Sequence, residues 1–299
     1  MKFTRNVLFV ALFSLSSILM ARNQPQPSPD WAAVEKALGR SGQPQADGTM
    51  KFGMPRKDLK VTVDGLEIKP GLALGSWVAF SKPQGDALLM GDLVLTEDEV
   101  GPVMARLQAS GIQITALHNH VLHESPRIMY MHIGAHGAPV KLAEAVHDAV
   151  SLTKTPGPDS GPAPAAPQDI GIDTSQIEQA LGHKGKVNGG IFQVGVPRAE
   201  QITHSGMAVP PSMGLATALN FQPTGNGKAA ITGDFVLLGT EVNPVIQALR
   251  SNGIQVTALH SHMLDEQPRL FFMHFWANDD AVKLAKGLRA ALDQTNSKK

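Results

Sequence analysis

The sequence lacks cysteine, and it carries no excess of charge of either sign. A chain of 299 residues without cysteine forms no disulfide and offers no cysteine for a lipid anchor, so its hydrophobic core has to stabilise it. Its 26 basic and 26 acidic residues cancel, so neither nucleic acid nor an anionic membrane is an expected partner. We find no cysteine nucleophile, glycine-rich phosphate loop or Ser-His-Asp order, which leaves those catalytic classes without support.

A long apolar run is missing everywhere except at the N-terminus. Lys2 and Arg5 precede an apolar run over residues 7–20 that ends at Ala21. This order predicts a secretory signal peptide over residues 1–21, and the run is short for a membrane span. An uncleaved N-terminal anchor is the alternative. We expect a periplasmic or secreted protein with no transmembrane domain after cleavage.

The rest of the chain is a tandem duplication. VEKALG at 34–39 returns as IEQALG at 177–182, and GDLVL at 91–95 returns as GDFVL at 233–237. Such self-similarity indicates two copies of one structural unit. The expected organisation is a spacer at 22–30, repeat 1 at 31–153, a Pro-rich linker at 154–169 and repeat 2 at 170–295.

Within each repeat the pattern predicts an α+β fold. A short helix opens repeat 1 near Trp31, and β-like runs separated by turns then fill residues 51–95. A capping box at Thr96 and Glu99 opens a second helix, two strands follow at 112–122 and 129–134, and a helix closes the repeat. Strands cluster at the front of each repeat, which disfavours a doubly wound parallel sheet. We expect an antiparallel-rich sheet with packed helices, in two domains or in one pseudo-twofold pair.

The histidines recur at a constant offset of 260 − 118 = 142 residues. In a strand, alternate residues share a face, so residues 112, 114, 116, 118 and 120 are expected to point the same way. With a loop centred on Pro126, His132 would lie opposite His120, close enough for three imidazoles to bind one ion. Each repeat would then hold its own cluster. The expected ligands are His118, His120 and His132 in the first copy, and His260, His262 and His274 in the second.

Three histidines with an open fourth position suit a transition metal, with zinc first and copper, nickel or iron as alternatives. An earlier turn at 121–123 would instead bring Glu124 beside His120 and carry His132 away. A His-x-His pair can also be a satisfied polar row at the end of a strand. His123, His136 and His147 have no counterpart in the second copy and are expected at the surface.

A Glu and an Arg also recur at the same spacing in the hairpin of each copy. Glu124 and Glu266 are candidates for a fourth ligand or a general base. Arg127 and Arg269 could grip an anionic substrate, pair with the nearby Glu, or be solvated turn residues. The remaining repeated charges are expected to be turn and cap residues rather than catalysts. They are Arg56, Arg198, Asp92 and Asp234.

The repeated GDxVL, Ala-Leu-His-x-His-x-Leu and Pro-Arg-x-x-x-x-His motifs resemble those of the LppY/LpqO family of exported bacterial proteins. The likeness covers residues 31–292 as two tandem copies. Membership implies an exported protein without an established activity. It does not imply a particular substrate or a bound metal. The absence of a lipidated cysteine departs from the name-giving members and puts membrane anchoring in doubt.

Three functions are compatible with these observations. The protein could bind a transition metal as a carrier or sensor. It could be a metal-dependent hydrolase or oxidase acting on an envelope substrate, with Glu124 or Glu266 transferring protons and Arg127 or Arg269 holding an anion. It could also bind a small-molecule envelope ligand without metal, through pH-responsive histidines. The sequence leaves open whether it is an enzyme, its oligomeric state, and whether the two sites share one cleft.

Overall fold

The computed structural model describes residues 31–81, 85–158 and 169–299. The expected signal peptide and spacer, and most of the expected linker, lie outside these residues. Each repeat forms a six-stranded sheet with the same topology: β1-β2-β5-β6-β9-β7 in the first and β10-β11-β14-β15-β17-β16 in the second. All strand pairings within the two sheets are antiparallel.

The elements of repeat 1 follow the expected order. They are α1 (Trp31–Leu38), β1 (Gln43–Pro44), β2 (Met50–Pro55), β3 (Val61–Val63), β4 (Leu66–Ile68), α2 (Pro70–Ala73), β5 (Gly75–Phe80), β6 (Ala87–Thr96), α3 (Glu97–Ala109), β7 (Gln113–His118), β8 (Glu124–Ser125), β9 (Ile128–Gly137) and α4 (Pro139–Val150). The predicted capping box is present, because Thr96 and Glu99 bond each other's backbone.

Repeat 2 uses the same plan. Its elements are α5 (Thr174–Leu181), β10 (Gly185–Asn188), β11 (Ile191–Pro197), β12 (Thr203–His204), β13 (Met207–Ala208), the 3-10 turn η1 (Pro211–Met213), β14 (Ala216–Gly225), β15 (Lys228–Leu238), α6 (Val242–Ser251), β16 (Gln255–His260), β17 (Leu270–Asp280) and α7 (Ala281–Leu292). In the described part of the chain no helix is long and apolar enough to cross a membrane.

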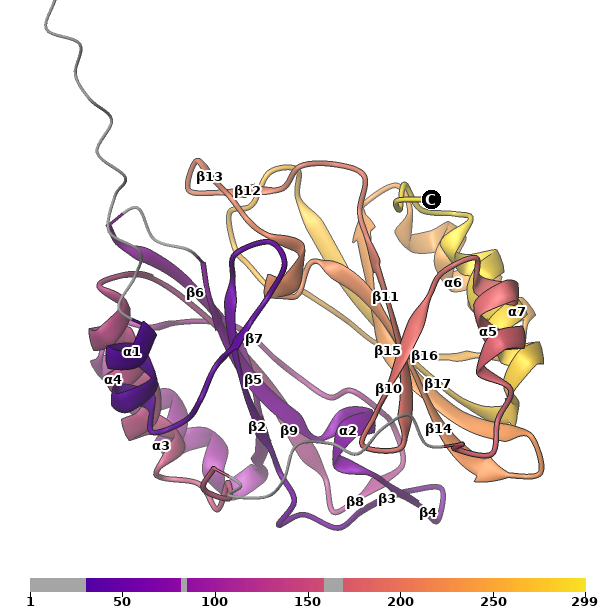
Figure 1. Ribbon diagram of the computed structural model, residues 1–299, viewed down its shortest axis with the longest axis horizontal. Coiled ribbons are helices and arrows are strands. Elements are labelled where there is room, and N and C mark those ends of the chain that lie inside the picture. Colours follow the sequence, from indigo (N-terminus) through magenta and orange to yellow (C-terminus); the bar gives the residue numbers. More distant parts are fainter. Residues whose placement is uncertain (1–30, 82–84, 159–168) are drawn as a thin grey trace, which may run out of the picture.

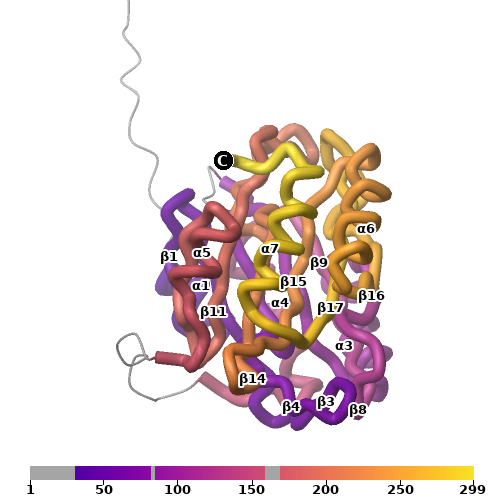
Figure 2. The backbone as a smooth tube through the Cα atoms, turned by 90° about the vertical axis from the view of Figure 1, so that its right-hand side faces the viewer, coloured from indigo at the N-terminus to yellow at the C-terminus, as the bar shows by residue number. Residues whose placement is uncertain are grey.

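The layers run helix, sheet, sheet, helix. Helices α1, α3 and α4 cover the outer face of the first sheet, and α5, α6 and α7 cover the outer face of the second (Figure 1). Figure 2 looks onto the second set of helices, which lie across their sheet. The two inner sheet faces therefore pack against each other, and the centre of the molecule lies between the repeats.

Apolar residues of both repeats fill the space between the sheets. On one side Val94, Ile128 and Tyr130 of repeat 1 pack with residues of repeat 2 that include Trp276. On the other side the equivalent residues of repeat 2, each 142 positions later in the chain, pack with residues of repeat 1. These equivalents are Val236, Leu270 and Phe272. This confirms the α+β tandem fold with a pseudo-twofold arrangement. It also shows that the repeats share a core rather than standing as separate domains.

The Arg after the second strand of each repeat is buried rather than solvated at a turn. The Arg56 guanidinium is fully buried, donates to both oxygens of Glu99 at 2.7 and 3.1 Å, and donates to Asp58 and the Val94 carbonyl. Arg198 repeats these contacts with Glu241. Because Glu99 also caps α3, this ion pair ties the helix to the sheet.

The expected hairpin register is wrong. His132 lies opposite Ala116, and Tyr130 lies opposite His118, so the register differs from the expected pairing of His132 with His120. A register shift between Ile114 and Ala116 marks a β-bulge, and the second copy has the same shift between Val256 and Ala258. An inserted residue inverts the alternation of side chains. Ile114 accordingly packs against the helices, while His118 beyond the bulge faces the other sheet.

Candidate metal centre

Six histidines meet midway between the two sheets, three from each repeat. Three pairs of rings lie closest together between the repeats. The distances between ring centroids are 3.7 Å for His118 and His260, 3.9 Å for His120 and His274, and 3.8 Å for His132 and His262. The last two distances are pseudo-symmetric equivalents. The two expected sets of three histidines therefore lie together in one group, because the inner faces of the two sheets bring both sets together.

Strand and loop geometry place these rings. His132 lies within β9 and His118 ends β7, while His120 lies in the loop that follows. Side chains of repeat 2 hold that loop: Thr257 donates to the His120 carbonyl at 2.5 Å and accepts, through its own carbonyl, from Asn119 at 3.1 Å. The histidine positions thus depend on contacts that neither repeat makes alone.

Two carboxylates complete the group that we call the central cluster, which comprises the six histidines with Asp92 and Asp234. Each Asp lies inside a strand beside a cluster histidine, Asp92 opposite His132 and Asp234 opposite His274. An Asp92 oxygen lies 3.4 Å from His120 Nε2, and an Asp234 oxygen lies 3.0 Å from His262 Nε2. The expectation that these aspartates are turn or cap residues is wrong. The sequence signal that identifies them is a charged residue inside an apolar strand, repeated in both GDxVL motifs.

Backbone carbonyls fix several of the rings. The Nδ1 atoms of His118, His262 and His274 lie 2.9, 3.2 and 2.6 Å from the carbonyls of Asn119, Gly214 and Gly233. A carbonyl only accepts, so Nδ1 carries the hydrogen in each case. The Nε2 lone pair is then free to bind a metal, which is the usual arrangement of histidine ligands.

The Nε2 atoms of the rings have no hydrogen-bond partner among the described residues. Nε2 of all six histidines is buried and accepts or donates no hydrogen bond within the described residues, and the same is true of Oδ1 of Asp92 and Asp234. His262 Nε2 lies within ion-pair distance of Asp234, but the geometry of this contact is not that of a hydrogen bond. Buried polar atoms are nearly always paired, so this concentration of unpaired ones marks a group of side chains that could hold a metal ion.

Burial also keeps five of the six rings neutral. Burial, and then the neighbouring histidines, hold the pKa of His120, His132 and His274 well below 6.5. Burial is also the main cause that lowers the pKa of His262 to about 3, and the same cause lowers that of His260. For Asp234, burial raises the pKa to about 6. Neutral imidazoles close together offer lone pairs to a cation rather than repelling it.

Two subsets of the cluster bring one ligand atom from each residue within 4.8 Å of the others. They are His118, His260 and His274, and His132, His260 and His262. Both subsets mix the repeats, and His260 belongs to both. Histidine nitrogens with a nearby carboxylate suit a transition metal, so these residues fit such an ion.

The expected catalytic residues lie in the loop that closes each hairpin. Glu266 is fully buried, accepts twice from Arg269 at 3.1 and 3.2 Å, and accepts from the Leu270 backbone at 2.8 Å. In repeat 2, then, the Arg pairs with the nearby Glu. Glu124 accepts from the Ile128 backbone at 3.1 Å, while its Oε2 is buried and unpaired. Burial raises its pKa to about 7.

The remaining expected positions are exposed. Arg127 and Arg269 both lie at the surface, where Arg269 pairs with Glu266. His123, His136 and His147 are exposed, which confirms their assignment to the surface. None of them belongs to the central cluster.

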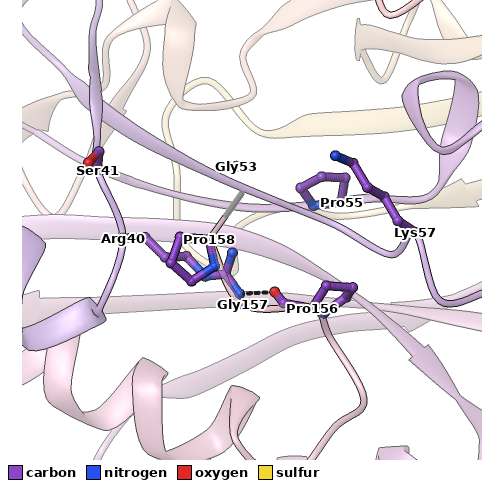
Figure 3. A pocket seen from close by; sticks show the side chains of 8 residues that line it. All are labelled: Arg40, Ser41, Gly53, Pro55, Lys57, Pro156, Gly157 and Pro158. Carbon is purple, nitrogen blue, oxygen red and sulfur yellow. Dashed lines mark hydrogen bonds between the residues drawn. The ribbon is translucent and has the colours of Figure 1, made fainter. Parts of the chain in front are cut away.

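A surface pocket of about 170 Å³ lies elsewhere, beside the first sheet (Figure 3). Its lining combines two cationic side chains, Arg40 and Lys57, with the chain at 156–158, and Arg40 donates to the Pro156 carbonyl. It shares no residue with the central cluster. The unpaired ligand atoms, rather than this hollow, define the functional candidate.

The fold and the cluster define a tandem-repeat α+β protein with histidine groups that could hold a metal ion. The chain belongs to the family described as Domain of Unknown Function (DUF1259), whose model matches residues 32–152 and again 175–294. No curated protein is a significant match.

Two solved structures show only a faint likeness to this chain. The trimeric bacterial microcompartment shell protein PduB is 11% identical over 83% of this chain and 88% of its own, with a TM-score of 0.20. EtuB from Clostridium kluyveri is 9% identical over 83% of this chain and 89% of its own, with a TM-score of 0.19. Neither score supports an argument about fold or function.

Proposed function

We propose that the protein binds one or two transition metal ions in the central cluster, as a carrier or sensor. The observation that carries this proposal is the set of six buried, unpaired Nε2 atoms, several of them oriented by Nδ1 bonds to carbonyls. An isolated buried polar group costs about 1–3 kcal/mol when it is left unpaired. A bound ion would satisfy several of these atoms at once.

Burial favours binding over turnover. His118, His132, His262 and His274 are each at most 9% exposed, and Asp92 is 5% exposed. Catalytic metals keep a coordination position open to substrate, whereas structural and storage sites are closed. This ranks a metal-dependent hydrolase or oxidase second. A metal-free module with pH-responsive histidines ranks third, because the lowered pKa values leave those rings neutral across the physiological range.

The ligand chemistry also limits the metal. Imidazole nitrogen with a carboxylate suits zinc first, and copper, nickel or iron as alternatives, while magnesium and calcium prefer oxygen alone. We propose a resident transition metal on that ground. The likeness to the LppY/LpqO family and the residues 1–21 support an exported site of action, which an intact mass beginning after Ala21 would establish.

Elemental analysis tests the proposal. The mature protein, purified without an affinity tag, is expected to carry close to one or two equivalents of zinc, copper, nickel or iron. The double variant His118→Ala/His260→Ala removes the central ring pair and is expected to lose the metal. The control His123→Ala/His136→Ala removes two exposed histidines and is expected to keep it. A wild-type protein that stays metal-free and cannot be loaded at neutral pH would refute the proposal.

A further inference from the structure

The two halves of the central cluster differ at one aromatic position. Tyr130 stacks on His120 with ring centroids 3.3 Å apart, and Phe272 stacks on His262 at 3.5 Å. These pairs are pseudo-symmetric, at 272 − 130 = 142 residues. The same packing is thus made with a phenol in one half and a plain phenyl ring in the other. The hydroxyl group is the chemical difference between them.

The Tyr130 hydroxyl has no protein partner. The residue is 0% exposed, and its oxygen is buried without a hydrogen bond in the part of the chain that the structure describes. A buried, unpaired hydroxyl costs about 1–3 kcal/mol. Phe272 shows that the packing does not need this group, so the hydroxyl requires another explanation.

The surroundings of Tyr130 are rich in unpaired oxygen. Asp92 Oδ1 and Glu124 Oε2 are both buried and unpaired. In the pairing of β6 with β9, Asp92 lies opposite His132 and Val94 lies opposite Tyr130, so Asp92 and Tyr130 are diagonal neighbours on one face of the sheet. The pKa of Tyr130 is raised well above 10, first by burial and then by the charges of Glu124 and Asp92. In the second half the corresponding Glu266 is fully bonded to Arg269 and Leu270. Only the first half therefore combines a phenol with two partnerless carboxylate oxygens.

We propose that the Tyr130 oxygen binds a metal ion of the central cluster beside Asp92, and that this half of the cluster prefers ferric iron. The inference rests on the proposed function. Mixed oxygen and imidazole donors suit iron, and tyrosine is a known iron ligand type. The phenol oxygen bonds to the ion, and its proton leaves to the medium. The second half, with Phe272, offers His262 and Asp234 without a phenol and suits zinc.

Absorption spectroscopy isolates this contact because Tyr130 is the only tyrosine in the chain. The metal-free full-length protein is loaded with ferric iron from a weak chelate, and its iron and zinc contents are measured in parallel. Iron bound to a phenolate gives a visible charge-transfer band that histidine and carboxylate ligands do not give. Wild type is expected to show the band. Tyr130→Phe, which copies the second repeat, is expected to lose it entirely while zinc still binds in the second half, which does not contain Tyr130.

The reciprocal variant Phe272→Tyr supplies a second phenol and is expected to add to the band, or to restore it in Tyr130→Phe. Iron bound to wild type without the band would overturn the inference, as would zinc uptake with no iron uptake, or a band that survives in Tyr130→Phe. In each of these cases the proposed function stands. Failure of wild type to bind any metal would instead overturn the proposed function, and the inference with it.

Discussion

His118 and His260 stack on each other at the centre of the molecule, 3.7 Å between ring centroids, although 142 residues separate them in the chain. They are equivalent residues of the two repeats, so the pseudo-twofold relation between the repeats pairs each with its own copy. A site built around this pair exists only when both sheets are in place. Metal binding and the assembly of the two repeats are therefore expected to be one event.

The first prediction concerns the separated repeats. Residues 31–153 alone would expose the inner face of their sheet, including Ile128 and Tyr130, which are now 0% exposed. We expect this fragment to aggregate, or to pair with itself, and to bind metal only in the paired state. Light scattering with metal analysis checks this. A monomeric fragment that binds metal as tightly as the full chain would contradict the shared site.

The second prediction concerns acid stability without metal. His120, His132 and His274 have a pKa well below 6.5 in the folded protein and near 6.5 when unfolded. Below pH 6.5 the unfolded chain takes up protons that the folded protein does not, so stability is present above pH 6.5 and is lost as the pH falls. Each such histidine contributes about 1.4 kcal/mol per pH unit. Urea unfolding of metal-free protein at pH 7.5 and 5.5 measures this loss, and equal stabilities would contradict the prediction that the lowered histidine pKa values dominate the acid response.

The third prediction compares the two hairpin glutamates. The pKa of Glu124 is raised to about 7, chiefly by burial. The folded state therefore holds this proton between pH 4.5 and 7, and the stability that it contributes is lost as the pH rises through 7. Glu124→Gln stays neutral and can still accept from Ile128, so we expect it to be more stable than wild type by about 1–2 kcal/mol at pH 8, allowing for partial exposure, and similar at pH 5.

Glu266→Gln is the matched control for that comparison. Its carboxylate is paired with Arg269, so the change removes a charge-assisted bond and is expected to destabilise the protein at both pH values. Chemical denaturation of both variants at pH 5 and pH 8 makes the test. Equal effects of the two substitutions would mean that the hairpins are equivalent, contrary to the contacts described above.

Much of the fold follows from the sequence because its signals are local. The helix beginning at Trp31 and the capping box at Thr96 each depend on neighbours in the chain, and the structure contains both. The internal duplication likewise indicates the pseudo-twofold arrangement. The six histidines could be chosen for the same reason, since they recur at one fixed spacing.

The arrangement of the site could not be predicted in the same way. The bulge between Ile114 and Ala116 adds one residue to a strand and reverses the facing of everything after it, and no turn residue marks it. The pairing of His132 with His262 depends on which faces of the two sheets meet, a long-range property. The glycine before Asp92 suggests a turn in the sequence, whereas in the structure the close approach of Val78 and the Trp77 carbonyl explains Gly91.

Anomalous scattering at the absorption edge of the bound metal tests the central claim most directly. Crystals of the metal-loaded full-length protein are expected to give an anomalous peak between the two sheets, within bonding distance of histidine nitrogens from both repeats, and no such peak in His118→Ala/His260→Ala. A metal peak bound by one repeat alone, or only at surface histidines such as His136, would contradict the account.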